Sequence, residues 1–215
     1  MALNILKYNS DKGLMVFDRT EVTSIKHTAG EIIAETNRGV NIGCKHVIYC
    51  TGYESTQQLQ ENVVDLKSTY AIASEAFKDL PDVFEHKIFW DNSSPYFYFR
   101  GTDDNRIVMG GGDVRFKNAS ARDALIAKKE KMLVKKFEEF FPAIKFKSDY
   151  AWAGTFGETI DGLPYIGKPD ANKNEHYVLG FGGNGITFSV MGMEAIVASL
   201  QNKPHPFLEY YKFGR

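Results

Sequence analysis

The segment of this 215-residue chain with the clearest potential for chemistry is Tyr177–Phe188, YVLGFGGNGITF. Its Gly180, Gly182 and Gly185 have the spacing G-x-G-x-x-G, which is typical of a dinucleotide-binding turn. An apolar run precedes them and a predicted helix follows, so orphan N–H groups at the helix start would face an electron-rich ligand. The chain beyond that helix offers no second parallel strand ending in Asp or Glu, as a nicotinamide-binding unit requires. Two interpretations of the glycines stay open, a ligand loop of another kind and a tight turn that only serves packing.

A second candidate is the run Tyr96-Phe97-Tyr98-Phe99-Arg100. Side chains alternate between the two faces of a strand, so Tyr96, Tyr98 and Arg100 share one face and the phenylalanines share the other. One face of this strand is therefore expected in a core. The other offers hydroxyls and a guanidinium to a ligand.

The third candidate is the segment VIYCTGY. The unbroken apolar run Val47–Cys50 predicts a strand covered on both faces, and Thr51-Gly52 follows it. Glycine at the carboxyl end of such a strand allows the backbone to turn closely against a ligand.

Other chemistries are excluded by composition and spacing. Pro169 stands where a phosphate-binding loop built on Gly162, Gly167 and Lys168 needs Ser or Thr. The five histidines are scattered without metal-ligand spacing, and no G-x-S-x-G motif occurs, so neither a metal site nor a nucleophilic hydrolase is expected.

The bulk composition favours a small-molecule ligand. With 26 basic and 27 acidic residues the net charge is −1, which favours neither nucleic acid nor a membrane surface. The cysteines, Cys44 and Cys50, form no disulfide framework, and neither a signal peptide nor a run of ~18 apolar residues is visible. We therefore expect a cytoplasmic protein.

Two β-rich blocks are predicted to position these candidates. Three or so strands are expected between Gly13 and Thr51, with turns near Ala29-Gly30 and Arg38-Gly39. More strands are expected from Thr69 to Asp113, with a hairpin turn at 103–105.

Two helices complete the expected elements. One amphipathic helix is predicted from about Ala121 to Phe141, opened by Ser120 with Asp123 as a capping-box-like pair and stopped by Pro142. Its apolar stripe consists of Ile126, Leu133, Phe137 and Phe140. A last helix is predicted from about Ile186 to Leu200.

Four segments, in this order, resemble the C-terminal portion of the D-amino acid oxidase-like (DAO) family of FAD-dependent oxidoreductases. They are VIYCTGY, YFYFRGTDDNRIVMGGGD, AWAGTFGETIDGLPYIG and LGFGGNGITFSVMGMEA. The resemblance implies a mixed α+β fold, in which the remainder of an FAD/NAD(P)-binding-type domain accompanies an antiparallel-sheet substrate domain with one long packed helix. Residues 1–55 and 154–215 would belong to the flavin domain, and residues 56–153 to the substrate domain.

The same resemblance implies the residues of a site for FAD and a small amine or amino acid. The backbone of the glycine-rich loop would hold the pyrimidine edge of the flavin, where negative charge collects on reduction. The implied cofactor-binding residues are Thr51, Gly52, Gly182, Gly183, Asn184, Gly185, Ile186 and Thr187. The implied substrate residues are Tyr98, Arg100, Thr155 and Phe156, and no catalytic base is nominated.

Two departures from the family pattern shape the functional prediction. Amino-acid-oxidising members commonly carry an arginine near AWAGTFGETIDG, whereas this stretch offers Thr155, Phe156 and Glu158, and it contains no cysteine for a covalent flavin link. The family also opens with a strand, a G-x-G-x-x-G turn and a helix, which are not seen before LNILKYNSDKG. We therefore expect a fragment that carries half of a non-covalent flavin site.

Two functional hypotheses follow. The first is the C-terminal part of a flavin-dependent amine or amino acid oxidase or dehydrogenase that transfers a hydride from a C–N bond to FAD. The alternative is a catalytically silent chain that acts as a structural or interaction module, with a homo-oligomer formed through the exposed edge of the HVIYC strand. For the chain alone we expect weak or absent flavin binding and no activity.

Overall fold

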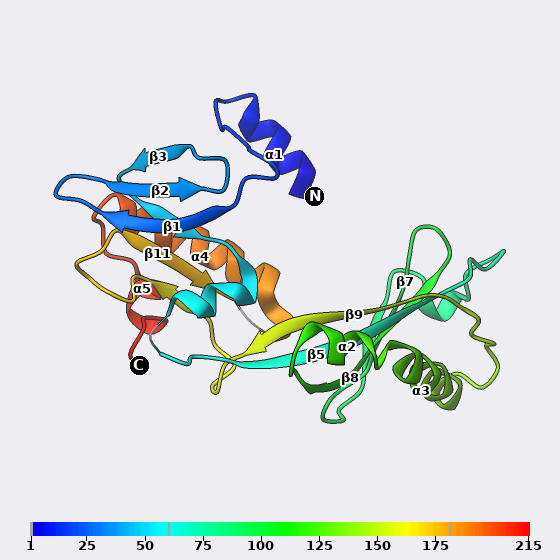
Figure 1. Ribbon diagram of the computed structural model, residues 1–215. Coiled ribbons are helices and arrows are strands. Elements are labelled where there is room, and N and C mark those ends of the chain that lie inside the picture. Colours follow the sequence, from blue (N-terminus) through cyan, green and yellow to red (C-terminus); the bar gives the residue numbers. More distant parts are fainter. Residues whose placement is uncertain (1, 60, 181) are drawn as a thin grey trace. The chain divides into compact units, whose positions relative to one another are not determined.

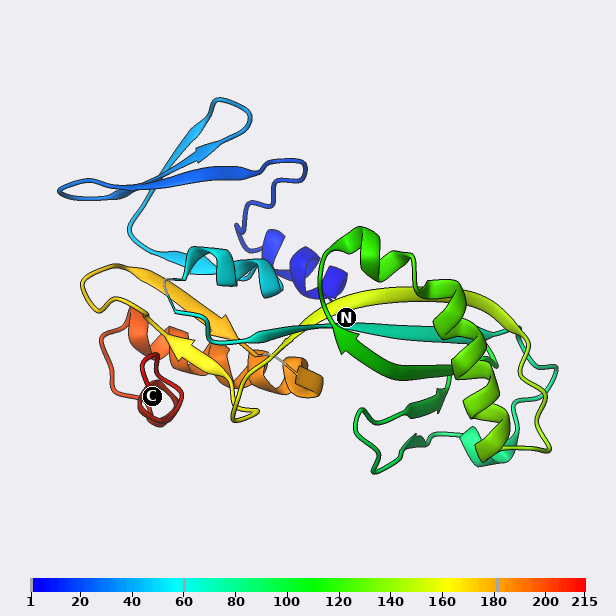
Figure 2. The ribbon, with the colours of Figure 1, turned by 60° about the horizontal axis from the view of Figure 1, so that its bottom comes forward.

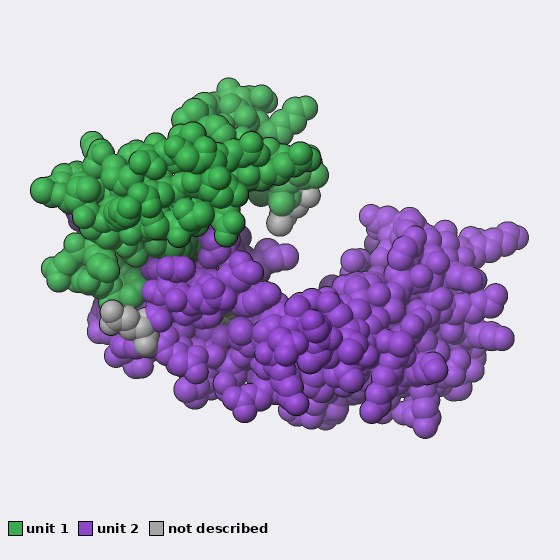
Figure 3. Space-filling model, in the orientation of Figure 1, with its two compact units in different colours: residues 1–49, 168–176 green, residues 50–167, 177–215 purple. Residues whose placement is uncertain are grey.

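The computed structural model describes residues 2–59, 61–180 and 182–215. These residues divide into two compact units, which Figure 3 colours separately. Unit 1 contains residues up to 49 together with 168–176, and unit 2 contains residues 50–167 and 177–215. These bounds differ from the domain boundaries expected from the sequence, which stay a prediction.

Unit 1 is built on a three-stranded antiparallel sheet. Helix α1 (Ala2–Ser10) is followed by β1 (Val22–His27), β2 (Ile32–Thr36) and β3 (Asn41–Cys44), paired in that order. The two predicted turns join these strands. The first strand begins at Val22, and Arg19 before it adopts a positive φ of 49°.

Unit 2 contains a five-stranded antiparallel sheet (Figures 1 and 2). Its order is β6-β7-β8-β5-β9, so the long strands β5, β8 and β9 lie side by side. The bounds are β5 (Asp65–Ser74), β6 (Ile88–Trp90), β7 (Tyr98–Gly101), β8 (Ile107–Arg115) and β9 (Ser148–Glu158). The predicted hairpin turn joins β7 to β8, with Asn105 at a φ of 59°.

One face of this sheet is covered by a helix, as Figure 2 shows. The helix predicted as one piece is two, α2 (Ala119–Asp123) and α3 (Ile126–Phe140). The prediction of Ser120 as the opening cap is also wrong, because the Asn118 side chain accepts a hydrogen bond from Ala121 N at 2.8 Å. Asn satisfies a free N–H of the first turn as Ser would, so the helical segment starts earlier than the capping-box pattern indicated.

The core of unit 2 lies between α3 and the sheet. It contains Tyr70 and Ile72 of β5, Phe99 of β7, Ile107 and Met109 of β8, and Leu133 and Phe137 of α3. All of these residues are at most 2% exposed. The predicted apolar stripe therefore packs largely as expected, although Phe140 at its end remains 40% exposed.

A smaller part of unit 2 surrounds the glycine-rich loop. Strand β10 (Tyr165–Gly167) pairs with the end of β11 (Glu175–Leu179), and α4 (Gly185–Leu200) and α5 (Pro206–Tyr210) follow. Short 3₁₀ turns, η1 (Gly52–Gln58), η2 (Asp82–Phe84) and η3 (Gly182–Asn184), complete the elements. The helix predicted from about Ile186 is α4, which begins one residue earlier.

The apolar strand expected to be covered on both faces is shorter and more open. It is β4 (Val47–Tyr49), which lies at the edge of the three-stranded sheet of order β10-β11-β4. Ile48 is 44% exposed, so the prediction of a fully covered strand is wrong. A continuous apolar run shows that a strand can be buried, but neighbouring elements decide whether it is.

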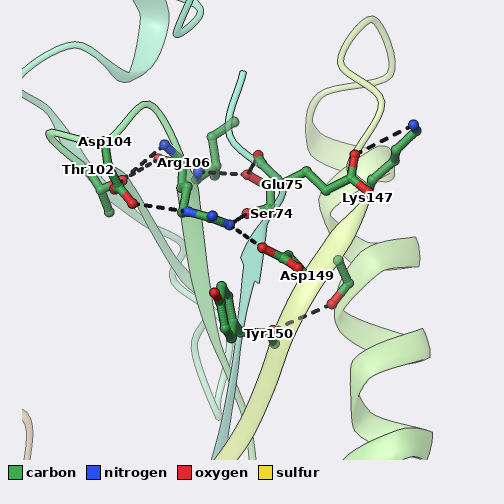
Figure 4. A network of polar contacts seen from close by, with 10 residues as sticks. Ser74, Glu75, Thr102, Asp104, Arg106, Lys147, Asp149 and Tyr150 are labelled. Atoms are coloured by element: carbon green, nitrogen blue, oxygen red, sulfur yellow. Dashed lines mark hydrogen bonds and ion pairs between the residues drawn. The ribbon is translucent and has the colours of Figure 1, made fainter. Parts of the chain in front are cut away.

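A polar network closes the hairpin end of the five-stranded sheet (Figure 4). Arg106 Nη1 donates to Ser74 O at 2.7 Å and to Asp149 Oδ2 at 2.6 Å, and its Nε donates to Asp104 at 3.0 Å. The buried Ser74 hydroxyl accepts from Ile107 N at 2.9 Å and donates to Glu75 O at 2.7 Å. This network ties the start of β8 to β5 and β9.

Together these elements confirm the predicted mixed fold, with antiparallel sheets and a long packed helix.

Candidate functional site

A cavity of about 890 Å³ lies within unit 2. One wall is the sheet face opposite α3, with Thr69 (β5), Tyr98 (β7), Asp113 (β8) and Phe156 (β9). A second wall is Gly182–Asn184, at the start of α4. The rim comes from β6 and the loop after it, with Ile88, Trp90, Asp91, Ser93 and Tyr96. The cavity therefore joins the glycine-rich loop to the polar face of the sheet.

Strand alternation accounts for most of the sheet wall. The buried Tyr70 and Phe99 point into the core, so their neighbours Thr69 and Tyr98 point to the other face. Phe156 of β9 pairs with Lys67, two residues from Thr69 on β5, and so shares its face. These three side chains are presented by ordinary strand geometry.

Asp113 reaches the same wall only because β8 is irregular. Tyr70 pairs with Gly111 and Ser68 pairs with Val114, so Gly112 and Asp113 together lie opposite the single residue Thr69. Such a bulge changes the face to which the following side chains point.

Two glycines allow this bulge. Gly111 has a φ of 137° and Gly112 a φ of 69°, values that favour glycine. A Cβ on Gly112 would lie 2.5 Å from Met132 Cε of α3, so Gly112 faces the core. The next residue, Asp113, faces the cavity. Without the bulge, Asp113 would follow Ile107 and Met109 into the core.

The Asp113 carboxyl is incompletely satisfied. Its Oδ1 is buried and accepts no hydrogen bond from any residue that the structure describes. Burial raises the pKa of Asp113, and a hydrogen bond from the Thr69 side chain opposes this rise. Burial also raises the pKa of Tyr98, and the negative charge of Asp113 adds to this rise. The two side chains therefore sit in a partly dehydrated wall.

The second carboxylate of the cavity is hydrogen-bonded within its own loop. Asp91 Oδ1 accepts from Phe97 N at 2.7 Å, and the Ser93 hydroxyl lies 2.8 Å and 2.7 Å from the two carboxylate oxygens of Asp91. These bonds close the loop between β6 and β7. Asp91 therefore has a structural role that Asp113 lacks.

The glycine-rich wall has room for a ring. Gly182 has a φ of 74° and open space where a Cβ would be, whereas a Cβ on Gly183 would lie 2.9 Å from Tyr96 Oη. Asn184 precedes α4 without a side-chain cap bond. The backbone, rather than side chains, thus forms this surface, which suits the close approach of a planar group.

The structure brings together only part of the predicted site. Tyr98, Phe156 and Gly182–Asn184 line the cavity, and Gly185, Ile186 and Thr187 form the first turn of α4. Thr51 and Gly52 lie outside the lining, at the start of η1. The roles of these residues stay predictions.

Two predicted substrate residues also lie outside the lining. Arg100 is exposed and its Nη1 donates to Gly101 O at 3.2 Å. Thr155, the neighbour of Phe156 on β9, accepts from Arg122 Nη1 at 2.9 Å. Thr155 is on the strand face opposite that of Phe156, whereas Arg100 shares the cavity face of β7 and lies beyond the lining.

Sequence reasoning did not nominate Asp113. The available signal was the triple glycine Gly110–Gly112 directly before a carboxylate inside a predicted strand, because glycine in a strand interior marks bulges. Trp90 at the rim was not nominated either, whereas Tyr96 was placed on the polar face of its strand.

Unit 1 contains a histidine pair that the sequence did not indicate. His46 Nδ1 and His176 Nε2 are 3.3 Å apart, although 130 positions separate the two residues in the sequence. Burial, followed by the charges of His46 and Lys168, lowers the pKa of His176 to about 4. The described residues contain no group of three metal-ligating side chains.

The comparisons with known proteins concern nearly the whole chain. Residues 2–198 match the family model described as FAD dependent oxidoreductase, DAO. The chain belongs to this family. The resemblance stated from the four sequence segments is thereby confirmed.

Individual relatives agree with this assignment. The chain is 28% identical over 213 residues to gamma-glutamylputrescine oxidoreductase of Escherichia coli (strain K12), covering 94% of this chain and 48% of that protein. The chain therefore spans about half the length of the curated relative it matches.

Solved structures show the same fold. Glycine oxidase from Geobacillus kaustophilus is 19% identical with a TM-score of 0.72, covering 96% of this chain and 55% of that one. L-proline dehydrogenase from P. horikoshii is 18% identical with a TM-score of 0.75, covering 94% of this chain and 55% of that one.

Family membership implies FAD, and the cavity fits part of it. The open space beside Gly182 leaves room for a planar ring next to the sheet wall. Among the residues described, no helix is both long and apolar enough to cross a bilayer.

Proposed function

We propose that this chain forms the flavin-ring and substrate side of an FAD-dependent oxidoreductase that oxidises a C–N bond of a small amine or amino acid. The main support for the proposal is that the glycine-rich loop and the polar sheet face line the same cavity. Membership of the FAD dependent oxidoreductase family supports it.

Each wall of the cavity has a distinct role in this proposal. Gly182–Asn184 and the first turn of α4, Gly185–Thr187, would hold the pyrimidine edge of the ring. A helix start favours negative charge, so this wall would stabilise the reduced cofactor. Tyr98 and Phe156 would contact the substrate from the opposite wall. Arg100 and Thr155, which lie outside the lining, are not part of the proposal.

The reaction divides between cofactor and protein. FAD, when bound, supplies the acceptor for the two electrons and the hydrogen that leave the C–N bond, and water then hydrolyses the resulting imine. The protein residues orient the amine against that acceptor and exclude water around it. Thr51 and Gly52 are proposed to approach the nucleotide part of the cofactor.

Three further parts of the proposal concern the link to the cofactor, the cellular location and the pairing of copies of the chain. The cofactor is proposed to bind without a covalent link, since the two cysteines, Cys44 and Cys50, lie outside the cavity lining. Two free thiols suit a cytoplasmic location. The edge strand β4 is proposed as a pairing surface between copies of the chain.

A fluorescence titration tests the proposed function. If this chain supplies mainly ring contacts, riboflavin and FAD should bind with similar, weak affinity, and both should lose fluorescence as the protein is added. Complete absence of quenching with either flavin up to about millimolar protein would contradict the proposal and support the catalytically silent module.

Two variants locate the binding. Gly183→Val adds a side chain whose Cβ would lie 2.9 Å from Tyr96 Oη. It should weaken flavin binding at least about tenfold. Gly30→Ala is the control, because nothing lies within 4 Å of a Cβ there. Equal quenching by wild type and Gly183→Val would place the flavin elsewhere.

A further inference from the structure

The cavity has an unusual charge balance for a site that takes an amino acid. Its charged lining residues, among those described, are Asp91 and Asp113, and no arginine or lysine lines it. A carboxylate substrate needs a cation to bind it, preferably a bidentate arginine. The described wall therefore repels a carboxylate and attracts a cation.

One of the two carboxylates has a buried oxygen without a hydrogen-bond partner among the described residues. Asp91 is occupied by Phe97 N and the Ser93 hydroxyl. Asp113 Oδ1 has no partner among the described residues. An oxygen left unpaired in a buried position costs free energy unless a ligand supplies the donor.

The nearest lysines bind other partners. Lys129 Nζ donates to Gly112 O at 2.6 Å and lies 5.2 Å from the centre of the Tyr70 ring. Lys67 Nζ lies 3.6 Å from Glu158. Neither forms an ion pair with Asp113 in the described part of the chain, although both charges lower its pKa. No ion pair in the described part of the chain therefore neutralises the Asp113 carboxylate.

The bulge in β8 places the Asp113 carboxylate in the cavity wall. Two glycines at positive φ turn Asp113 away from the core and toward the cavity. Aromatic rings of Trp90, Tyr96 and Tyr98 also line the cavity, and ring faces attract ammonium groups.

We propose that Asp113 binds an ammonium group of an aliphatic diamine, on a nitrogen other than the one that is oxidised. This inference rests on the proposed function, which supplies the oxidation. An amine that loses a hydride from its carbon must have a free lone pair to form the imine. An ammonium held by a carboxylate stays protonated. The nitrogen at Asp113 is thus the anchor of the substrate, and the second nitrogen is free to react.

The test is calorimetric titration of the full chain with 1,4-diaminobutane. Adipate is the matched ligand, because it places two carboxylates across the same four methylenes. We expect the diamine to bind and adipate not to bind. Tighter binding of adipate, or no binding of the diamine, would overturn the proposal.

The matched variants are Asp113→Asn and Asp103→Asn. Asp113→Asn keeps the shape but removes the charge, and should weaken diamine binding at least about tenfold. Asp103 is exposed in the hairpin turn and lies outside the cavity lining, so its variant should bind as wild type does. Asp113→Ser provides a second variant of smaller volume, and equal affinity of all forms would overturn the proposal.

Flavin quenching measured on the same samples separates the two levels of inference. Flavin binding without diamine binding would overturn the role of Asp113 and leave the proposed function standing. Diamine binding that depends on Asp113, without flavin binding, would retain the anchor and contradict the oxidoreductase.

Discussion

The two ends of β8 treat polar groups in opposite ways. At its start, hydrogen bonds of Arg106 and Ser74 connect β8 to β5 and β9. At its end, Asp113 holds a buried oxygen without a partner. The first arrangement stabilises the sheet, whereas the second costs stability. A protein keeps an unsatisfied buried group where binding requires it, because stability and function compete at such sites.

The largest expected effect comes from changing the bulge itself. Gly111→Ala forces a non-glycine residue to a φ of 137° and brings a Cβ within 2.7 Å of Tyr96 O. The free energy of unfolding should fall by about 3 kcal/mol, as expected for backbone strain combined with overpacking. Urea denaturation measures this change.

The control for the bulge is Gly154→Ala on β9. Its φ is not positive and its Cβ would lie 3.5 Å from Thr69 Cγ2, an ordinary contact. Its effect should stay within about 0.5 kcal/mol. Equal losses from the two glycine variants would show that the bulge is not under special constraint.

The next effect comes from breaking the polar network around Arg106 and Ser74. Ser74→Ala leaves the buried Ile107 N–H without its acceptor and should lower the free energy of unfolding by about 2 kcal/mol. Ser148→Ala is the control, since its hydroxyl makes only a 3.5 Å contact to Tyr150 O. No loss in Ser74→Ala would mean that the network contributes nothing to stability.

The smallest effect has the opposite sign. Asp113→Asn removes the charge of a half-buried, unpaired carboxyl, so at neutral pH the free energy of unfolding should rise by about 1 kcal/mol after allowance for solvent screening. Denaturation at pH 7 tests the sign. Destabilisation by this variant would group Asp113 with the structural residues.

The pH dependence of the same variant follows from linkage. Burial raises the pKa of Asp113 in the folded chain above its ordinary value, so the folded state binds more protons than the unfolded state between these two values. The free energy of unfolding contributed by this group therefore falls as pH rises through that window. The variant should lack this fall and match wild type below the window.

The sequence predicted the parts of the site that depend on local periodicity. Alternation placed Tyr98 opposite Phe99, and the glycines before α4 pointed to Gly182–Asn184, which line the cavity. Both depend only on neighbouring residues in the chain. The role of Gly182–Asn184 as a ligand loop stays a prediction. The family resemblance likewise used motifs that can be seen without a fold.

The rest depends on contacts between distant segments. Period-2 alternation from Ile107 places Asp113 in the core, and only its pairing with β5 shows that the bulge reverses it. The exposure of Ile48 depends on which strand lies beside β4. Thr155 has suitable chemistry but lies on the face of β9 opposite that of Phe156, and Arg100 shares the face of Tyr98 but lies outside the lining, where its Nη1 donates to Gly101 O.

Direct titration of Asp113 tests the central claim that the bulge presents an unpaired carboxylate for a ligand ammonium. The carboxyl carbon signal of Asp113, assigned by its loss in Asp113→Asn, can be followed by NMR as pH is varied. The account predicts that the pKa of Asp113 lies above its ordinary value in the free chain and falls when 1,4-diaminobutane saturates the cavity. A pKa at its ordinary value, or one that the diamine leaves unchanged, would contradict it.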